Sequence, residues 1–422
     1  MFRASIPHLI DRAFLARLAD GLAVAVAFSL PWSTSATSIL VTLWLLALIP
    51  TLSWTVLRRE LLSPAGGLPV LLIAFGIIGM AWAEVALYER WEGLDSFVKL
   101  IAVPLLICQF AKSGRGQQVF IAFLVSCIVL LIASYMLTFF PEFPWKTSRD
   151  PGVMVKSYIV QSIEFTLCAA ALLNMAVEAA ILHRWLNSGA YAALAIAFLF
   201  DIFFIATSRT ALVVIGVLAL AYGARRYGWK GFVAAGVVGV VVAGILWATS
   251  PYLRHRVTGI LSETVTYETK NISTPSGERL EFWMKSLDFI KSAPLIGHGT
   301  GSIPEMFRRA AVGKVGVRAE VSTNPHNQTF AVAIQLGLFG TALLWGMWIS
   351  HLLVFRGSGL VAWIGMTLVI QSIVGCLFNS FLFDFTEGWI YVFGFGVAAG
   401  MMRRQFDRTD SGIAGAGKVP AR

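Results

Sequence analysis

Charged residues are scarce in this sequence. Only 13% of the 422 residues are Asp, Glu, Lys or Arg, whereas 57% are hydrophobic and the mean hydropathy is +0.74. Soluble globular domains are about a quarter charged and about half apolar, so this composition excludes a protein made of soluble domains. Apolar stretches recur from residue 20 almost to residue 402, and many approach the roughly 20 residues that a transmembrane helix needs.

Cysteine and metal-binding motifs are also rare. The four cysteines lie in apolar stretches, without the spacing of disulfide frameworks or metal sites. The sequence has no Walker motif, no HExxH motif and no clear Asp-x-Asp pair that would hold a metal against a diphosphate. We therefore predict no metal and no cofactor. If the substrate carries phosphates, basic side chains must neutralise them.

The basic balance of the chain has a topological explanation. The net charge is +10, which can indicate nucleic-acid binding, but Lys and Arg also accumulate in the cytoplasmic loops of multispanning proteins. We predict no nucleic-acid partner. No cleavable signal peptide is evident, because a basic amphipathic start precedes the first apolar stretch, which we expect to remain as an anchor.

Hydropathy predicts an all-α integral membrane protein with about twelve transmembrane helices. The predicted spans are 14–31, 37–57, 67–86, 95–111, 117–139, 157–182, 189–207, 210–224, 231–250, 327–354, 359–382 and 386–402. The distribution of Lys and Arg places both termini in the cytoplasm. Residues 1–250 then hold nine spans, 251–326 form a large outer loop, 327–402 hold three more spans, and 403–422 form a disordered tail.

The outer loop, residues 251–326, is polar and carries both charge signs. It is long enough to fold against the membrane as a cap. Within it, Leu280, Trp283, Leu287 and Ile290 recur at helical spacing. This pattern predicts a short amphipathic helix on the outer membrane interface.

Arg209 interrupts two apolar stretches within Thr-Ser-Arg-Thr. An arginine at membrane depth is costly unless a partner or a water-filled cavity receives it, so Arg209 is a functional candidate. The alternative is an arginine that extends to lipid phosphates at a helix end. Ser208, its neighbour, is a secondary candidate.

Arg279 lies in the first turn of the predicted interfacial helix. A cation at the positive end of a helix is unfavourable unless an anion binds there, and free backbone N–H groups help to bind one. The alternative is a local pair with Glu278 or Glu281, which would contribute little.

His326 follows Asn324 and Pro325, which are typical of an N-cap and a first helical residue. The sequence therefore predicts that His326 lies in the opening turn of the tenth span. The helix dipole disfavours the imidazolium there, so the ring stays neutral and able to accept a proton. The alternative is a polar residue that only satisfies a helix end. Asn324 and Asn327 are secondary candidates.

Other groups carry weaker signals. Lys146, Arg149 and Lys156, in the loop 141–156, either hold an anionic substrate or face lipid phosphates. The glycines of 297–301 follow no predicted strand and precede no phosphate-loop lysine. We interpret that run as a turn.

Taken together, these motifs resemble the O-antigen ligase and polymerase superfamily. The resemblance rests on Thr-Ser-Arg-Thr at a hairpin, Arg-Leu-Glu-Phe-Trp and Ala-Pro-Leu-Ile-Gly-His-Gly-Thr-Gly in the outer loop, and Asn-Pro-His-Asn-Gln before the next span. It is strongest from Gln161 to Gly337. Ten residues separate His326 from Gly337, which matches a His-x10-Gly pattern of the ligases.

The resemblance implies a glycosyltransferase of the GT-C class in the bacterial inner membrane, with a periplasmic active site. It implies transfer of a finished glycan from undecaprenyl diphosphate to lipid A-core. The reaction would require no metal and would invert the anomeric centre. Arg209 and Arg279 would bind the diphosphate and His326 would serve the acceptor. Membrane lipids are the other expected partners.

Three related activities share these motifs: ligation, repeat-unit polymerisation and transfer to Ser or Thr of a protein. The short tail and the histidine at position 326, where polymerases more often have arginine, favour ligation. A lipid-linked glycan transporter is the alternative from another class, and it predicts internal repeats and charged helices near the midplane.

Overall fold

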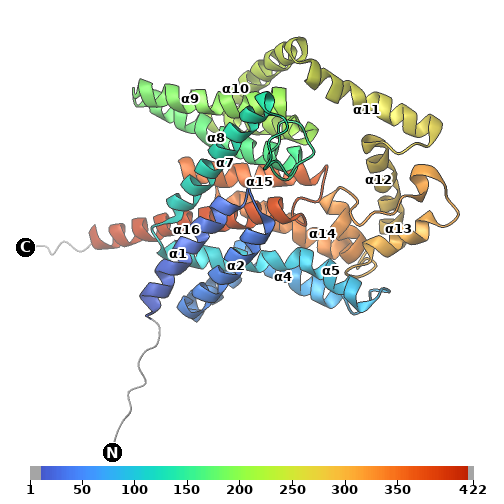
Figure 1. The fold of residues 1–422 in the computed structure, drawn as a ribbon. Helices are drawn as coiled ribbons and strands as arrows, with labels where there is room; N and C mark the ends of the chain where they lie inside the picture. Colours follow the sequence, from blue (N-terminus) through green and yellow to red (C-terminus); the bar gives the residue numbers. More distant parts are fainter. Residues whose placement is uncertain (1–10, 417–422) are drawn as a thin grey trace, which may run out of the picture.

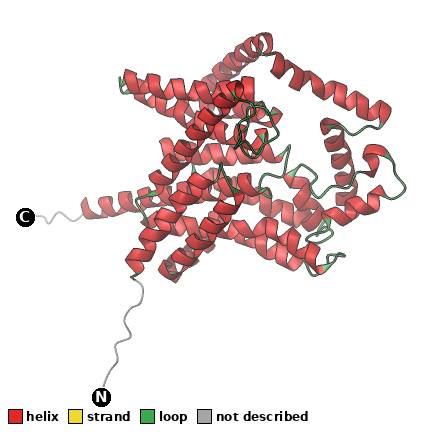
Figure 2. Ribbon diagram, in the orientation of Figure 1, coloured by secondary structure: helices red, strands yellow, loops and turns green. Residues whose placement is uncertain are grey.

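The chain is helical throughout the part that the structure describes. The computed structural model describes residues 11–416, and no strand occurs among them (Figure 2). In chain order the elements are α1 (Arg12–Ser29), α2 (Thr34–Leu48), η1 (Ile49–Thr51), α3 (Trp54–Leu61), α4 (Pro64–Gly79), α5 (Leu87–Val98), η2 (Lys99–Ile101), α6 (Ala102–Lys112), α7 (Gly116–Phe139), α8 (Tyr158–Ile181), α9 (Trp185–Phe200), η3 (Asp201–Ile205), α10 (Arg209–Thr249), α11 (Pro251–Lys270), α12 (Pro275–Ser292), α13 (Ile303–Ala311), η4 (Gly316–Ala319), α14 (Gln328–Val354), α15 (Leu360–Cys376) and α16 (Phe385–Ala416).

Many of these helices have the length and composition of membrane spans. Seven qualify among the described residues, or eight if the bent pair α3 and α4 is one span. This agrees with a multi-pass membrane protein. Every predicted span overlaps a helix, and the twelve-span topology stays a prediction.

Several predicted boundaries differ from the helices. The span 37–57 ends at η1, and α3 is bent by 79° from α4. The last span continues as helix α16 to Ala416, although the sequence predicts a disordered tail from residue 403. Met, Arg and Gln at 401–405 are good helix formers, which explains the extension. Residues 417–422 of the predicted tail lie outside the described residues.

Glycine breaks two of the long helices. In α10 the backbone at Gly228 is non-helical (φ 62°, ψ −148°), which divides the element as the predicted spans 210–224 and 231–250 require. The two halves fold back on each other, because Gly236 packs against Leu220 and Gly223 lies against the backbone of Gly231. Only glycine adopts such a positive φ without strain.

The break in α14 joins the membrane bundle to the outer cap. At Gly337 (φ 60°, ψ −154°) the predicted continuous span 327–354 is interrupted. Backbone amides of residues 298–299 donate to the carbonyls of 334–335, and those of 338–339 donate to 294–295, over 2.8 to 3.3 Å. The loop thus supplies the hydrogen bonds that the break removes, and the predicted turn at 297–301 is confirmed.

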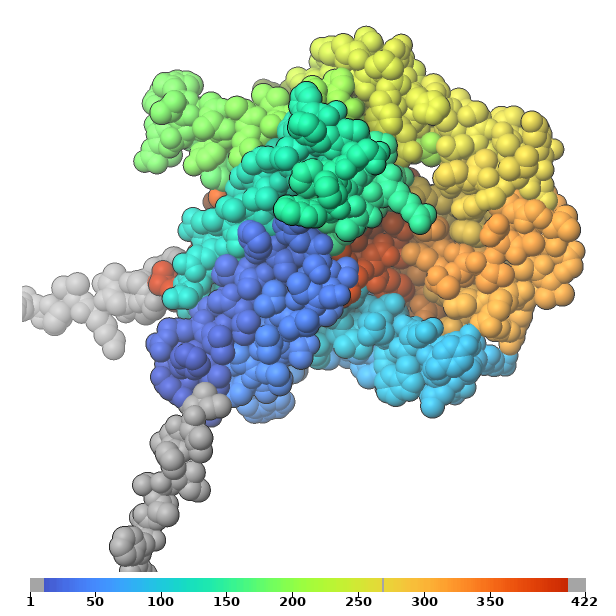
Figure 3. Space-filling model, viewed as in Figure 1, coloured from blue at the N-terminus to red at the C-terminus, as the bar shows by residue number. Residues whose placement is uncertain are grey.

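Residues 251–326 fold as a cap of three α-helices. Helices α12 and α13 share a small core with α14, formed by Phe282, Phe289, Ile303, Phe307, Ala331 and Ile334. Helices α10 and α11 arch over one side of the molecule (Figure 1). In the space-filling view the yellow α11 segment overhangs the orange segment of the cap (Figure 3). The predicted helix around Leu280–Ile290 is confirmed as part of α12.

Candidate functional site

Arg279 projects from the first turns of α12, which begins after the N-cap Thr274. The two acidic neighbours considered as its partners are engaged elsewhere: Glu278 accepts from Ser273, and Glu281 accepts from Tyr267 at 2.6 Å. Among the side chains that the structure describes, no carboxylate forms an ion pair with Arg279. The local-pair interpretation is therefore wrong, and the half-buried guanidinium keeps its donors free for another group.

The electrostatic surroundings of Arg279 are basic. Burial lowers the pKa of Arg279, and the nearby charges of Arg209 and Arg256 lower it as well, against the opposing effects of Tyr158 and Glu263. The Arg256 guanidinium also stacks over the Tyr158 ring, 4.7 Å from its centroid. Several positive charges gathered in a half-buried place favour the binding of an anion.

Arg209, the first residue of α10, is held by a carboxylate from α11. Its Nη2 and Nη1 donate to the two carboxylate oxygens of Glu263 at 2.8 and 3.2 Å, and its Nε donates to the Arg256 carbonyl at 2.7 Å. The hydrogen bonds from Arg209 hold the pKa of Glu263 at about 2. Ser276 Oγ also lies 2.5 Å from Glu263. The pair is only 22% exposed on both sides.

Sequence reasoning missed Glu263 and Ser276. They lie 54 and 67 positions after Arg209, and no short motif connects them. Hydropathy predicts the break between 210–224 and 231–250, but it does not predict that α11 brings Glu263 back to Arg209 at the start of α10. A charge pair across two helices becomes visible only once the helices are placed.

His326 lies in a turn, not in a helix. Its φ is 53°, and its amide donates to Asn324 Oδ1 at 2.8 Å. The helix α14 starts at Gln328, and its N-cap is Asn327, whose side chain accepts from the Phe330 amide. The predictions that Asn324 is the N-cap and that His326 is helical are therefore wrong. The Asn324 side chain forms a local turn instead, as asparagine often does.

The ring of His326 is oriented by the loop that follows α15. Nδ1 lies 2.8 Å from Asn379 Oδ1, and in this orientation of the amide the oxygen accepts from a ring proton assigned to Nδ1. Burial lowers the pKa of His326, and the positive charge of Arg279 lowers it further, while Asn379 opposes both. Nε2 then carries a free lone pair, and the ring stacks 6.2 Å from Phe282.

The three main site residues converge. Arg209 donates to Ser276 of α12 at 3.0 Å and the His326 ring stacks 6.2 Å from Phe282 of α12, so α12, which carries Arg279, joins residues from α10 and from the turn before α14. We call Arg209, Glu263, Arg279 and His326 the outer cluster. It combines two guanidinium groups, one of them without a carboxylate partner, with a neutral imidazole that can accept a proton.

The secondary candidates separate into two groups. Ser208, Asn324 and Asn327 adjoin the outer cluster through the chain, and Ser208 is the N-cap residue of α10. Lys156 points into the helix bundle instead, where its Nζ donates to Thr386 Oγ1 at 2.9 Å and to the Leu30 carbonyl. Lys146 is half-buried and Arg149 is exposed in the loop after α7.

These features define a class: a multi-pass helical membrane protein in which two guanidinium groups, a carboxylate and an imidazole gather where α10 meets a polar cap. A family model described as O-antigen ligase matches residues 194–345, about a third of the chain, and this segment contains the whole outer cluster. This match supports membership of the O-antigen ligase and polymerase superfamily, whose members are glycosyltransferase-like enzymes of glycan assembly. No curated protein matches the chain significantly.

Proposed function

We propose that this protein is an O-antigen ligase of the GT-C class. It transfers O-antigen polysaccharide from undecaprenyl diphosphate to a sugar hydroxyl of lipid A-core, at the periplasmic face of the bacterial inner membrane. The observation that carries the proposal is the position of Arg279 on α12, the helix whose Ser276 accepts from Arg209 at 3.0 Å and whose Phe282 ring stacks 6.2 Å from the His326 ring. The family match over residues 194–345 supports the same activity.

The chemistry is a substitution at the anomeric carbon. The acceptor oxygen forms a bond to that carbon while the carbon–oxygen bond to the diphosphate breaks and its electron pair leaves with the diphosphate. The hydroxyl proton passes to Nε2 of His326. Arg209 and Arg279 stabilise the negative charge that develops on the leaving group. Attack opposite the leaving group predicts inversion at the anomeric centre.

Glu263 is a positioning residue in this scheme. Its two oxygens hold the Arg209 fork in one orientation at 2.8 and 3.2 Å, which limits the movement of a long side chain. Arg279 has no such partner. We therefore propose that Arg279 makes the principal direct contact with the diphosphate, and that Arg209 contributes charge from a fixed position.

The test is transfer by the purified protein with an undecaprenyl-linked glycan and lipopolysaccharide core, with EDTA and without ATP. We expect product with the wild type and a loss of about 10²-fold or more with His326→Ala, which removes the base. His183→Ala, in the connection between α8 and α9, is the matched control. Near wild-type transfer by His326→Ala would falsify the base assignment.

Related activities are separated in cells. In a deletion strain, loss of long-chain lipopolysaccharide with accumulation of the lipid-linked polymer indicates ligation. Loss of the polymer itself indicates a polymerase, and loss of glycosylated protein indicates a protein acceptor. A transporter predicts no transfer by the purified protein.

A further inference from the structure

The turn that carries His326 is bound to the loop that follows α15. The bonded residues are 50 to 56 positions apart in the sequence. Four side chains of the segment 324–328 form hydrogen bonds to residues 377–383, over 2.7 to 3.3 Å: those of Asn324, His326, Asn327 and Gln328. The position of His326 is therefore set by tertiary contacts as well as by the helix that follows it.

The backbone of His326 depends on this support. Its φ of 53° lies in the left-handed region, which residues with a Cβ rarely adopt. The His326 amide donates to Asn324 Oδ1 at 2.8 Å, and the same oxygen accepts from Ser380 Oγ at 2.7 Å. Strained backbone persists where the surrounding structure holds it, and it is common at functional sites. The strained turn and the loop after α15 thus form one unit.

The His326 ring is held on two sides. Phe282 of α12 stacks 6.2 Å from it, and the half-buried Asn379 places Oδ1 2.8 Å from Nδ1. The partner of one ring nitrogen decides which nitrogen carries the proton. Since Nδ1 is engaged by Asn379, Nε2 is the nitrogen that can face a substrate hydroxyl.

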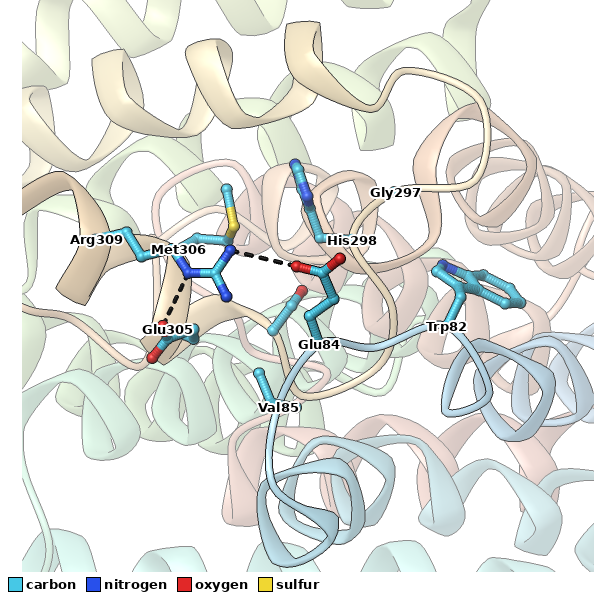
Figure 4. Close-up of a pocket in the computed structure, with 9 residues that line it drawn as sticks. Trp82, Glu84, Val85, Gly297, His298, Glu305, Met306 and Arg309 are labelled. Atoms are coloured by element: carbon cyan, nitrogen blue, oxygen red, sulfur yellow. Dashed lines mark hydrogen bonds and ion pairs between the residues drawn. The ribbon is translucent and has the colours of Figure 1, made fainter.

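The α13 side of the cap does not supply these contacts. There, Arg309 donates to Glu305 at 2.8 Å and to Glu84, in the α4–α5 connection, at 3.4 Å (Figure 4). None of residues 324–328 lines the cavity beside these pairs. The loop 377–383 is itself anchored at its far end, where Lys99 Nζ donates to the Phe383 carbonyl at 2.9 Å.

We propose that Asn379 is a positioning residue for the base of the transfer reaction. By accepting from Nδ1 it keeps the ring proton on that nitrogen, and it leaves the lone pair of Nε2 to take the proton of the acceptor hydroxyl. The inference rests on the proposed function, because it assigns a role to Asn379 only if His326 is the base.

The charges around the ring explain why an amide suits this position. Burial lowers the pKa of His326 most, the Asn379 hydrogen bond raises it, the Arg279 charge lowers it and the Glu278 charge raises it. Asp384, beyond the loop, interacts with Lys99 instead. A carboxylate in place of the amide would favour the imidazolium and shift the pKa of His326 upward by about one unit or more. A neutral acceptor fixes the proton without charging the base.

The experiment is the pH profile of transfer by the full-length purified protein. The substrates are the undecaprenyl-linked glycan and lipopolysaccharide core. Asn379→Ala is expected to lower kcat about tenfold or more at neutral pH, because the ring loses its fixed orientation and its fixed proton. Asn379→Asp keeps an acceptor for Nδ1, so we expect it to retain more transfer than Asn379→Ala above the acid limb of kcat/KM. Its acid limb should lie about one pH unit higher than that of the wild type.

The matched control is Asn187→Ala, at an exposed position of α9, which should transfer as the wild type does. A purely structural role of Asn379 predicts that transfer falls only as far as the midpoint of thermal unfolding does, with the acid limb of Asn379→Asp in its wild-type position. That result, or wild-type transfer by Asn379→Ala, overturns the inference. If Asn379→Ala does not fold, the limb of Asn379→Asp decides alone.

His326→Ala, assayed under the same conditions, separates this inference from the proposed function. If His326→Ala is inactive while Asn379→Ala transfers as the wild type does, His326 remains the base and only the role of Asn379 is wrong. If His326→Ala itself transfers as the wild type does, the base assignment fails, and the role of Asn379 fails with it.

Discussion

Two groups of charged side chains occupy different environments in this molecule. The outer cluster is half-buried between the cap and the start of α10, and Arg279 keeps free donors there. An inner cluster lies within the helix bundle: Lys99 donates to the carbonyls of Phe383 and Asp384 at 2.9 and 2.8 Å, and Lys156 donates to Thr386 at 2.9 Å. Glu164, which interacts electrostatically with Lys156, is 1% exposed.

The comparison shows how the same residue types acquire different roles. In the inner cluster, Lys99 and Lys156 donate to backbone carbonyls and to a hydroxyl of neighbouring segments. These hydrogen bonds hold the segments together. In the outer cluster, one cation is held by a carboxylate and the other is left for a ligand. Free hydrogen-bonding capacity, together with access, distinguishes a binding site from an internal polar contact.

The largest expected effect concerns Arg279. Arg279→Ala is expected to reduce transfer by roughly 10²- to 10³-fold, as removal of one preorganised donor typically does, with little change in the midpoint of thermal unfolding. Arg254→Ala, at an exposed position of α11, is the matched control in the purified assay. Equal losses in both variants would mean that the net charge of the cap, and not Arg279, matters.

Substitutions in the inner cluster should lower the stability of the protein. Lys156→Met removes the donor to the Leu30 carbonyl and to Thr386 Oγ1, and buried acceptors left without a partner cost about 2 kcal/mol. Lys156→Gln, which keeps a donor, should recover part of that loss. Unfolding in detergent, followed by circular dichroism, measures both. If Lys156→Met instead abolishes transfer at unchanged stability, Lys156 belongs to the substrate site.

The pH dependence of transfer tests the link between Arg279 and His326. Because burial and the Arg279 charge lower the pKa of His326 below its ordinary value of 6.5, the neutral base persists into mildly acidic solution. The acid limb of kcat/KM is therefore expected below pH 6.5, where protonation removes the base. In Arg279→Gln the pKa of His326 should rise, so the acid limb of the residual activity should lie at a higher pH. A limb that does not move would contradict the coupling.

The smallest expected effect concerns Glu263. Its pKa is lowered to about 2 from an ordinary value of 4.5, so its contribution to stability is present above pH 4.5 and is lost as the pH falls toward 2. Glu263→Gln removes the charge. At neutral pH we expect the free energy of unfolding to fall by about 1 kcal/mol, discounted for partial exposure. The midpoint of thermal unfolding should also change less with pH between pH 5 and 3. A parallel shift at all pH values would assign the loss to packing.

The sequence predicts the helices well and the connections poorly. Apolar runs locate each helix, because burial in lipid requires it. The start of α14 was misplaced by three residues, since Asn324 and Asn327 are equally good caps and only tertiary contacts select between them. Arg209, Arg279 and His326 stand out in the sequence because polar or charged residues are unusual beside apolar spans, and their roles stay predictions. Glu263 and Ser276 do not stand out, because nothing local distinguishes them from solvated polar residues.

The interruption at Gly337 restricts how the cap can open. Residues 294–299 and α14 exchange backbone hydrogen bonds across this break, so lifting the α13 side away from the membrane would leave several amides unpaired at once. The α11 side is joined to the rest of the molecule by side chains instead: Arg209 of α10 donates to Glu263 and to the Arg256 carbonyl, and Arg256 lies over the Tyr158 ring of α8. The two sides of the cap are therefore fixed by different means, one by backbone hydrogen bonds and the other by contacts that single substitutions can remove.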